Sequence, residues 1–177
     1  PHMLFNTLAN LRVLIGLDPA RAQAMLDHLI AYLRATLAAS RQPGHTATHT
    51  LATEFARLND YLALMAIRMG PRLRYTLDLP PELATCPVPP LLLQPLVENA
   101  IKHGLEPKVE GGSITVSARL DGTRMTLTVQ DTGVGLPQGQ RVVDGFGVAQ
   151  VRERLATTYG DQGAIELVAG HAGGTRA

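Results

Sequence analysis

Two stripes of apolar residues with the spacing of a helical face run through the first 40 positions. The first stripe contains Leu4, Leu8, Leu11 and Ile15, and the second contains Met25, Leu29, Leu33 and Leu37. Between the stripes, Gly16 favours the end of one helix, Asp18 is a good N-cap, and Pro19 suits the first position of the next helix. Because the interruption is short, the pattern predicts two antiparallel helices over residues 3–41, joined by a tight turn.

The next part of the chain changes from a linker composition to a third helix and then to a strand. Residues 41–50 combine Pro, Gly, Thr and His and predict a linker. Apolar residues at helical spacing over 51–69 predict a helix, which Gly70 and Pro71 end. Alternating apolar residues over 73–79 then predict a half-buried strand.

The last third of the chain alternates again and then becomes helical. Residues 114–120 and 125–129 have strand periodicity and are joined by an Asp-Gly dipeptide, which is a hairpin signal. A glycine-punctuated loop over 132–147 precedes another helix, and 165–168 predict a final strand. The order of elements predicts an α+β fold, in which a helical hairpin is followed by an α/β sandwich with helices on one face of a mixed sheet.

Composition narrows the class of protein. The chain has 177 residues, of which 45% are hydrophobic but only 4% aromatic, so it can build a sizeable, mainly aliphatic core. Its 16 basic and 15 acidic residues form no basic block, which argues against direct nucleic-acid binding. Cys86 is the only cysteine, so neither an internal disulfide nor a cysteine metal site is expected. No apolar run approaches the ~18 residues of a transmembrane helix.

Residues 95–104 carry an unusual set of polar side chains within an apolar helical pattern. On an α-helix, Glu98 and Lys102 are one turn apart, and so are Asn99 and His103, which places all four on one stripe. A core helix rarely buries such groups without partners. A carboxylate, an amide oxygen, an ammonium group and an imidazole together suit a magnesium ion and a polyphosphate. The stripe is therefore predicted to form one wall of a binding site.

Two glycine motifs follow this segment. Asp131-Thr-Gly133-Val-Gly135 comes after a strand, where the carboxylate can accept a hydrogen bond from an amino group such as that of adenine, and the glycines let a flat ring approach. Gly145-Phe-Gly147 opens a helix, where N–H groups and the helix dipole favour an anion. Taken alone, the first motif also fits an ordinary Asp-Gly turn, and the second fits a flexible loop with a glycine cap.

The three motifs, in this order, resemble the ATP site of the GHKL ATPases and, more narrowly, of LytS-like sensor histidine kinases. Residues 95–104 are similar to the family's N box nearly letter for letter. Residues 131–135 resemble the first glycine box, with Thr132 where the family usually has Asn. Residues 145–155 and 173–175 resemble the later glycine boxes. The resemblance implies a Bergerat-type ATP site within the α/β sandwich.

By this resemblance, each motif would supply a part of the ATP site. Asn99 would bind the magnesium ion that bridges the phosphates, and Glu98 would polarise the attacking group or a water near the metal. Lys102 and His103 would lie near the phosphates, and Asp131 would bind the adenine amino group. The remaining ATP-binding residues would be Gly133, Gly135, Gly145, Phe146, Gly147, Val148 and Thr175.

The first six residues resemble the family's phosphoacceptor motif, in which Phe is more frequent than Met at the third position. The resemblance implies that His2 attacks the γ-phosphorus through its neutral imidazole. Asn6, one helical turn on, would bond to the imidazole, the phosphoryl group or a water. It also implies a homodimer through a four-helix bundle, with two helices from each protomer. Two origins fit Pro1–Met3: the native motif, which we favour, and the remnant of a cloning site.

The resemblance also predicts the organisation of the chain. Residues 1–42 would be N-terminally truncated dimerisation and histidine-phosphotransfer helices, 43–50 a linker, and 51–177 the catalytic ATP-binding domain with a truncated last strand. The chain would be the ATP- and Mg²⁺-dependent autokinase core of a two-component sensor. Its partner would be a response regulator, often of the LytTR type in this family. It would be the cytoplasmic portion of a bacterial sensor that missing upstream segments anchor in the membrane. The alternative is a non-catalytic nucleotide-binding dimerisation module.

Overall fold

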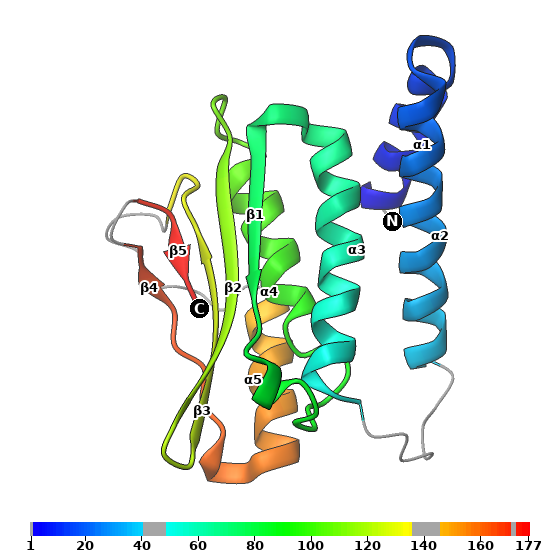
Figure 1. Ribbon diagram of the computed structural model, residues 1–177. Coiled ribbons are helices and arrows are strands. Elements are labelled where there is room, and N and C mark those ends of the chain that lie inside the picture. The colour runs from blue at the N-terminus through cyan, green and yellow to red at the C-terminus, as the bar shows by residue number, and fades with distance from the viewer. Residues whose placement is uncertain (1, 41–48, 136–145, 171–172) are drawn as a thin grey trace.

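The computed structural model describes residues 2–40, 49–135, 146–170 and 173–177, and of residues 2, 3, 35, 38–40 and 146 it describes the backbone alone. Figure 1 shows a helical hairpin beside a layer of helices, which lies against one face of a sheet. The predicted α+β class is therefore confirmed. None of the described helices is both long enough and apolar enough to cross a membrane.

The first two helices form the predicted antiparallel hairpin. α1 (His2–Leu17) and α2 (Pro19–Ser40) meet at Asp18, whose Oδ1 accepts a hydrogen bond from the Arg21 N–H at 3.1 Å. This N-cap satisfies one of the N–H groups that the start of a helix leaves without a partner. α2 then packs along α3 (Leu51–Met69), as Figure 1 shows.

α3 begins and ends where the sequence predicts. The Thr50 side chain accepts a hydrogen bond from the Thr53 N–H at 3.4 Å, and Gly70 adopts a φ of 61°, which favours glycine. Pro71 follows in a short 3-10 turn, η1 (Gly70–Arg72). The buried apolar residues of the helix are Leu51, Phe55, Leu58, Tyr61, Leu62, Leu64, Met65 and Met69. α3 is therefore the central layer between the hairpin and the sheet.

The described residues contain a sheet of five strands in the order β1-β2-β3-β5-β4. β1 (Leu73–Asp78) is parallel to β2 (Gly112–Asp121), and β2 is antiparallel to β3 (Arg124–Asp131), so the sheet is mixed, as predicted. The Asp-Gly hairpin turn is also present, with a φ of 58° at Gly122. Parallel pairing of β1 with β2 requires a crossover connection, and this one contains α4 (Gln94–Asn99).

Four further elements complete the helical layer. A 3-10 turn, η2 (Pro81–Leu83), follows β1, and a π-helical segment, η3 (Ala100–Leu105), continues α4 directly. α5 (Phe146–Tyr159) packs against α4 and ends in the 3-10 turn η4 (Gly160–Gln162). Figure 1 shows α4 and α5 on the same side of the sheet as α3. The core therefore lies between this helical layer and the inward face of the sheet.

The end of the sheet differs from the sequence prediction. A strand was expected over 165–168, but β4 contains only Val168–Ala169, which pairs with β5 (Thr175–Arg176). Ile165 and Leu167 instead pack, partly buried, against the core. In the observed register Val168 lies opposite Arg176 and Ala169 opposite Thr175, so these are the two residues whose backbone pairs with β5.

Candidate active site

Asp131 lies at the C-terminal end of β3 and is only 3% exposed. Its Oδ1 accepts a hydrogen bond from the Gly133 N–H at 2.8 Å, and the Thr175 N–H also donates to the carboxylate. Burial raises the pKa of the Asp131 carboxyl, while these two N–H groups and the nearby Lys108 ammonium act in the opposite direction. The carboxylate is therefore fixed in place but incompletely compensated for its lost hydration, so that a further donor would stabilise it.

Glycine backbones surround Asp131 so closely that no side chain would fit. A Cβ at Gly104 would lie 2.8 Å from Asp131 Oδ1, and a Cβ at Gly174 would lie 2.1 Å from the Asp131 carbonyl oxygen. A Cβ at Gly133 would lie 2.2 Å from the backbone carbonyl of Gly104. Gly135 and Gly174 also have φ values of 78° and 79°, which favour glycine. We call Asp131 and the three glycines at 104, 133 and 174 the Asp131 cradle.

Gly104 and Gly174 of the Asp131 cradle were not among the candidates from the sequence, and neither were two side chains at this end of the site, Lys108 and Thr132. The Nζ of Lys108 donates to the carbonyl oxygen of Thr132 at 2.7 Å. The Oγ1 of Thr132 accepts a hydrogen bond from the Ser113 N–H at 2.9 Å, so the residue that replaces the family's usual Asn ties the loop to β2. In the sequence, Lys108 is indistinguishable from an ordinary surface lysine. Its position shortly after the N-box segment is the one signal that could have indicated a role in the site.

Asn99 is the last residue of α4 and lies beneath the first turn of α5. A Cβ at Gly147 would lie 2.5 Å from Asn99 Nδ2 and 3.0 Å from the Pro95 carbonyl oxygen. The glycine therefore allows the N-terminus of α5 to rest on the N-box segment. Val148 follows it and is buried in the core at 5% exposure, so it anchors α5 to the rest of the domain.

Glu98 is held by side chains from two different elements. Its Oε1 accepts hydrogen bonds from Gln94 Nε2 at 3.0 Å and from the Tyr32 hydroxyl at 3.2 Å. Tyr32 belongs to α2, so this contact joins the helical hairpin to the N-box helix. Burial first, and then the charge of Glu98, raises the pKa of Tyr32 to about 12. The hydroxyl therefore stays protonated near neutral pH and acts as a donor to the carboxylate.

The predicted polar stripe is interrupted by a change of helix type. α4 ends at Asn99, and in η3 the Glu106 N–H donates to the carbonyl oxygen of Ile101 at 2.8 Å, five residues back. Lys102 and His103 are exposed in this wider helix. The prediction of one continuous α-helical stripe is therefore wrong. The π-helical segment instead buries its four apolar or small residues, Ala100, Ile101, Gly104 and Leu105.

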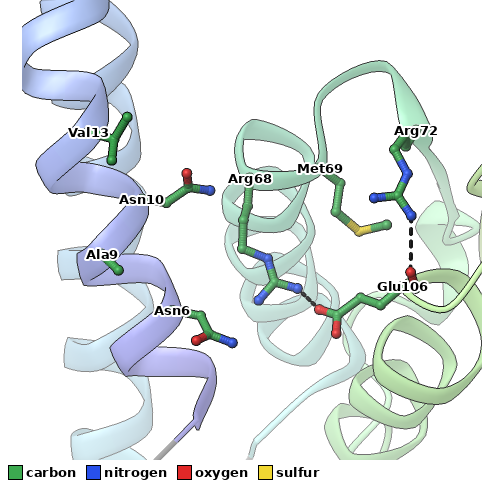
Figure 2. Close-up of a pocket in the computed structure, with 8 residues that line it drawn as sticks. All are labelled: Asn6, Ala9, Asn10, Val13, Arg68, Met69, Arg72 and Glu106. Atoms are coloured by element: carbon green, nitrogen blue, oxygen red, sulfur yellow. Dashed lines mark hydrogen bonds and ion pairs between the residues drawn. The ribbon is translucent and has the colours of Figure 1, made fainter. Parts of the chain in front are cut away.

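Asn6 lies in a different place from the Asp131 cradle. It lines a cleft of about 550 Å³ between α1 and the C-terminal end of α3 (Figure 2). Across the cleft, Arg68 forms an ion pair with Glu106, and Arg72 Nη2 donates to the Glu106 carbonyl oxygen at 3.0 Å. In the part of the chain that the structure describes, neither Glu98 nor Asp131 lines this cleft.

For three of the predicted site residues the structure describes either nothing or the backbone alone. Gly145 is outside the described residues, and only the backbone is described for His2 and Phe146. His2 is the first residue of α1, so its backbone belongs to the helical hairpin. Thr175 is half-buried on β5, next to the Asp131 carboxylate that its N–H contacts.

Comparisons with known proteins decide the family. Residues 1–73 match the family model described as histidine kinase, and residues 90–177 match the model for histidine kinase-, DNA gyrase B- and HSP90-like ATPases. This chain belongs to the histidine kinases. The ATPase match also identifies its second part as an ATP-binding domain, although neither match describes a metal ion.

Two curated sensor kinases are similar over nearly the whole of this histidine kinase chain. The sensor histidine kinase BtsS of Escherichia coli (strain K12) is 34% identical over 167 residues, which are 94% of this chain and 29% of that protein. The alignment with the sensor protein LytS of Staphylococcus haemolyticus (strain JCSC1435) has 30% identity over 178 positions and covers 94% of this chain and 30% of that protein. The chain therefore spans less than a third of the length of these relatives.

A solved structure supports the fold of this histidine kinase chain. The histidine kinase domain from the Erythrobacter litoralis EL346 blue-light activated histidine kinase superposes with a TM-score of 0.57. The alignment has 18% identity and covers 88% of this chain and 71% of that chain.

Proposed function

We propose that this chain is the core of an ATP-dependent protein-histidine kinase, which phosphorylates itself at His2 and passes the phosphoryl group to an aspartate of a response regulator. The observation that carries the proposal is the Asp131 cradle, because a buried carboxylate surrounded by glycine backbone suits a flat ring with an amino group. The family match of both halves supports it, since it joins a phosphoacceptor hairpin to an ATP-binding domain.

The Asp131 cradle fits adenine by the chemistry of its donors and acceptors. The carboxylate would accept a hydrogen bond from the exocyclic amino group, which would supply the further donor that the buried group lacks. A Cβ at Gly104 or at Gly174 would fall within 2.8 Å of Asp131 atoms, so glycine at both positions lets the backbone close around this carboxylate and hold it in place. Gly135 and Thr175 would contribute backbone to the same end of the pocket.

The other end of the site fits a magnesium ion that the nucleotide itself brings. Within the described ranges, no group of three or more His, Cys, Asp or Glu side chains could hold a metal ion. Nucleotide-bound Mg²⁺ needs only one or two protein oxygens besides phosphates and waters, and the amide oxygen of Asn99 can supply one. Gly147 at the start of α5 places helix N–H groups beside Asn99, where they would favour the phosphates.

The chemical step would depend mainly on positioning. Magnesium-bound ATP supplies the γ-phosphoryl group and neutralises its developing charge. The neutral imidazole of His2 would form the new N–P bond while the bond to the ADP oxygen breaks and its electron pair leaves with ADP. Glu98 would accept the hydrogen bond of the other imidazole N–H and take up its proton, and Asn6 would bond to the imidazole or to a water. Lys102 and His103 would reach the phosphates from the solvent side.

The helical hairpin would provide a dimer interface. Large apolar side chains remain exposed on both of its helices, namely Phe5, Leu8, Val13, Ile15, Leu17, Leu26, Ile30 and Leu37. An apolar surface of this extent on one hairpin is typical of a protein–protein contact. A second copy of the hairpin would cover it in a four-helix bundle. We propose a homodimer through residues 1–42, a linker over 43–50 and a catalytic domain over 51–177.

We also propose a partner and a cellular location for this chain. The response regulator would be of the LytTR type, because the chain resembles LytS-like kinases, and contact with DNA would be left to that partner. The sensor would be anchored in a bacterial membrane through segments upstream of the present sequence. The described part of the chain would lie on the cytoplasmic side, where ATP is available.

Calorimetric titration with ADP, with and without Mg²⁺, tests the nucleotide site. The wild type should bind ADP more tightly with magnesium, and Asp131→Asn should weaken binding by about 1–3 kcal/mol, because an amide replaces a buried charged acceptor. Asp161→Asn, in the exposed turn η4, is the matched control and should bind like the wild type. Unchanged affinity in Asp131→Asn would show that the adenine assignment is wrong.

Incubation with γ-labelled ATP tests the kinase activity. Label should enter the protein as acid-labile phosphohistidine, should be lost in His2→Ala, and should pass to a purified receiver domain. Magnesium-dependent ADP binding without any label would instead favour the non-catalytic nucleotide-binding module.

A further inference from the structure

One hydroxyl group connects the helical hairpin to the N box. Tyr32, at 8% exposure, reaches from α2 to Glu98, and its hydroxyl donates to Glu98 Oε1 at 3.2 Å. Gln94, at 4% exposure, donates from Nε2 to the same Glu98 oxygen at 3.0 Å and to the Tyr32 oxygen at 3.4 Å. Each of the three side chains is therefore hydrogen-bonded to the other two.

The ring of Tyr32 is itself fixed by packing. It packs against the ring of Tyr61 of α3 in a tilted arrangement, with a centroid distance of 5.6 Å and an interplanar angle of 44°. Burial, followed by the charge of Glu98, raises the pKa of Tyr61 as well, so both phenols stay protonated near neutral pH. The Tyr32 hydroxyl is therefore a permanent donor at a fixed position, and the acceptor it serves is the Glu98 carboxylate.

The position of Tyr32 along the hairpin matches that of His2. Asp18 is the joint between the two antiparallel helices, with His2 sixteen residues before it and Tyr32 fourteen residues after it. A difference of two residues corresponds to about 3 Å along a helix axis. The backbone of His2 therefore lies at nearly the same level of the hairpin as the tyrosine that holds Glu98.

We propose that Tyr32 is a positioning residue for phosphoryl transfer: through its hydrogen bond it holds the Glu98 carboxylate at the level of His2, where Glu98 acts on the attacking imidazole. The inference rests on the proposed autokinase function. Because the contact comes from α2, Glu98 is correctly placed only when the hairpin is docked on the ATP-binding domain. Nucleotide binding, which uses the Asp131 cradle, does not depend on it.

Tyr32→Phe separates this role from a structural one, because it keeps the ring that packs on Tyr61 and removes only the donor. In the 177-residue chain, the rate of His2 labelling at saturating ATP should fall roughly tenfold, the usual effect of losing one hydrogen bond to a charged group. The concentration of ATP that gives half the maximal rate, and the dissociation constant of Mg-ADP, should not change. Tyr75→Phe is the matched control, because the Tyr75 hydroxyl bonds to Asn59 Oδ1 at 3.3 Å on the exposed side of α3.

Each outcome of this experiment is decisive. An unchanged labelling rate in Tyr32→Phe, with the wild type labelled normally, overturns the role of Tyr32 and leaves the kinase proposal intact. A faster rate overturns it too, because Tyr32 would then hold Glu98 away from the reaction. Equal losses in labelling rate and in Mg-ADP affinity would show a structural defect instead. If the wild type is not labelled at His2 although it binds Mg-ADP, the kinase proposal fails and this inference fails with it.

Discussion

The two ends of the proposed nucleotide site are built in different ways. At the adenine end, Asp131 is surrounded by backbone N–H groups and glycines of the loops that join neighbouring strands and the N-box segment. At the phosphate end, Glu98 is held by Tyr32, a side chain 66 positions away on another helix. The adenine end therefore depends on the close approach of backbone segments, whereas Glu98 depends on a side-chain contact between two helical layers.

The phosphate end also depends on a second carboxylate that contacts residues far away in the chain. Glu54 of α3 is 0% exposed, and its two oxygens accept hydrogen bonds from the N–H groups of Leu93 at 2.9 Å and Leu91 at 3.2 Å. His49 Nε2 contacts the same side chain at 2.7 Å. Leu91 has a φ of 59°, a conformation that costs a non-glycine residue free energy. Glu54 therefore fixes the backbone that leads into α4.

The largest expected effect is the loss of this support in Glu54→Leu. The buried N–H of Leu93, the part-buried N–H of Leu91 and His49 would lose their acceptor, and removal of one partner from such a cluster costs about 3–5 kcal/mol. Urea denaturation should show this loss in the free energy of unfolding. Glu82→Leu, at an exposed position in η2, is the control and should change stability little. Similar losses in both variants would mean that Glu54 is not the support of α4.

A substitution that moves the backbone around Asp131 should weaken ADP binding at the adenine end. Gly174→Ala places a Cβ 2.1 Å from the Asp131 carbonyl oxygen at a φ of 79°, so the loop must move away from Asp131. Holding the loop in its binding geometry against overpacking of this kind would cost about 1–3 kcal/mol, and that cost, taken from the binding free energy, would lower ADP affinity by roughly 5- to 150-fold. Gly160→Ala is matched in backbone, with a φ of 56°, but its Cβ would meet no atom within 4 Å. Calorimetry should find normal ADP binding in that control. If both variants lose the same amount of ADP affinity, the Asp131 cradle is not the adenine site.

The sequence predicts the adenine end better than the phosphate end for a physical reason. Asp131, Gly133 and Gly135 are neighbours in the chain, so a short motif contains both the carboxylate and the backbone freedom it requires. The helix over 51–69 and the Asp-Gly hairpin were likewise predicted from local signals, namely apolar periodicity, capping and turn chemistry.

The phosphate end could not be predicted in the same way because its geometry comes from tertiary contacts. The spacing of Glu98, Asn99, Lys102 and His103 assumes 3.6 residues per turn, but the burial of Ile101 and Leu105 is achieved by a π-helix. Tyr32 gives no sign in the sequence that it contacts the N box, because a tyrosine on an apolar helix face normally indicates core packing. The strand expected over 165–168 was misplaced for a related reason, since the residues of β4 are those that lie opposite β5 in the sheet.

Asn99→Ala should abolish the contribution of magnesium to ADP binding and leave the binding of adenine unchanged. We expect magnesium no longer to strengthen ADP binding, with a loss of about 0.5–1.5 kcal/mol, because one neutral ligand oxygen is removed. ADP binding measured in EDTA should stay at the wild-type value, since the Asp131 cradle is intact. The control is Asn59→Ala on the exposed face of α3. If ADP binding in EDTA falls as well, Asn99 supports the pocket itself and the two ends are not independent.

The smallest effect concerns stability and pH at Asp131. Because burial raises the pKa of this carboxyl, its ionisation costs the folded state more than the unfolded state. The stability linked to the neutral form is fully present below the ordinary carboxyl pKa of about 4 and is lost as the pH rises through the raised value. Asp131→Asn is neutral at every pH, so without nucleotide it should melt at a higher temperature than the wild type at pH 7, and the difference should shrink toward pH 3.

The same substitution should weaken ADP binding, so stability and affinity should change in opposite directions. That combination would show that the folded chain tolerates an unfavourable buried charge because the ligand supplies the missing donor. A lower melting temperature for Asp131→Asn at pH 7 would instead show that the Gly133 and Thr175 N–H groups already satisfy the ionised carboxylate. The adenine end would then be stabilised by the same local contacts that shape it, without the ligand.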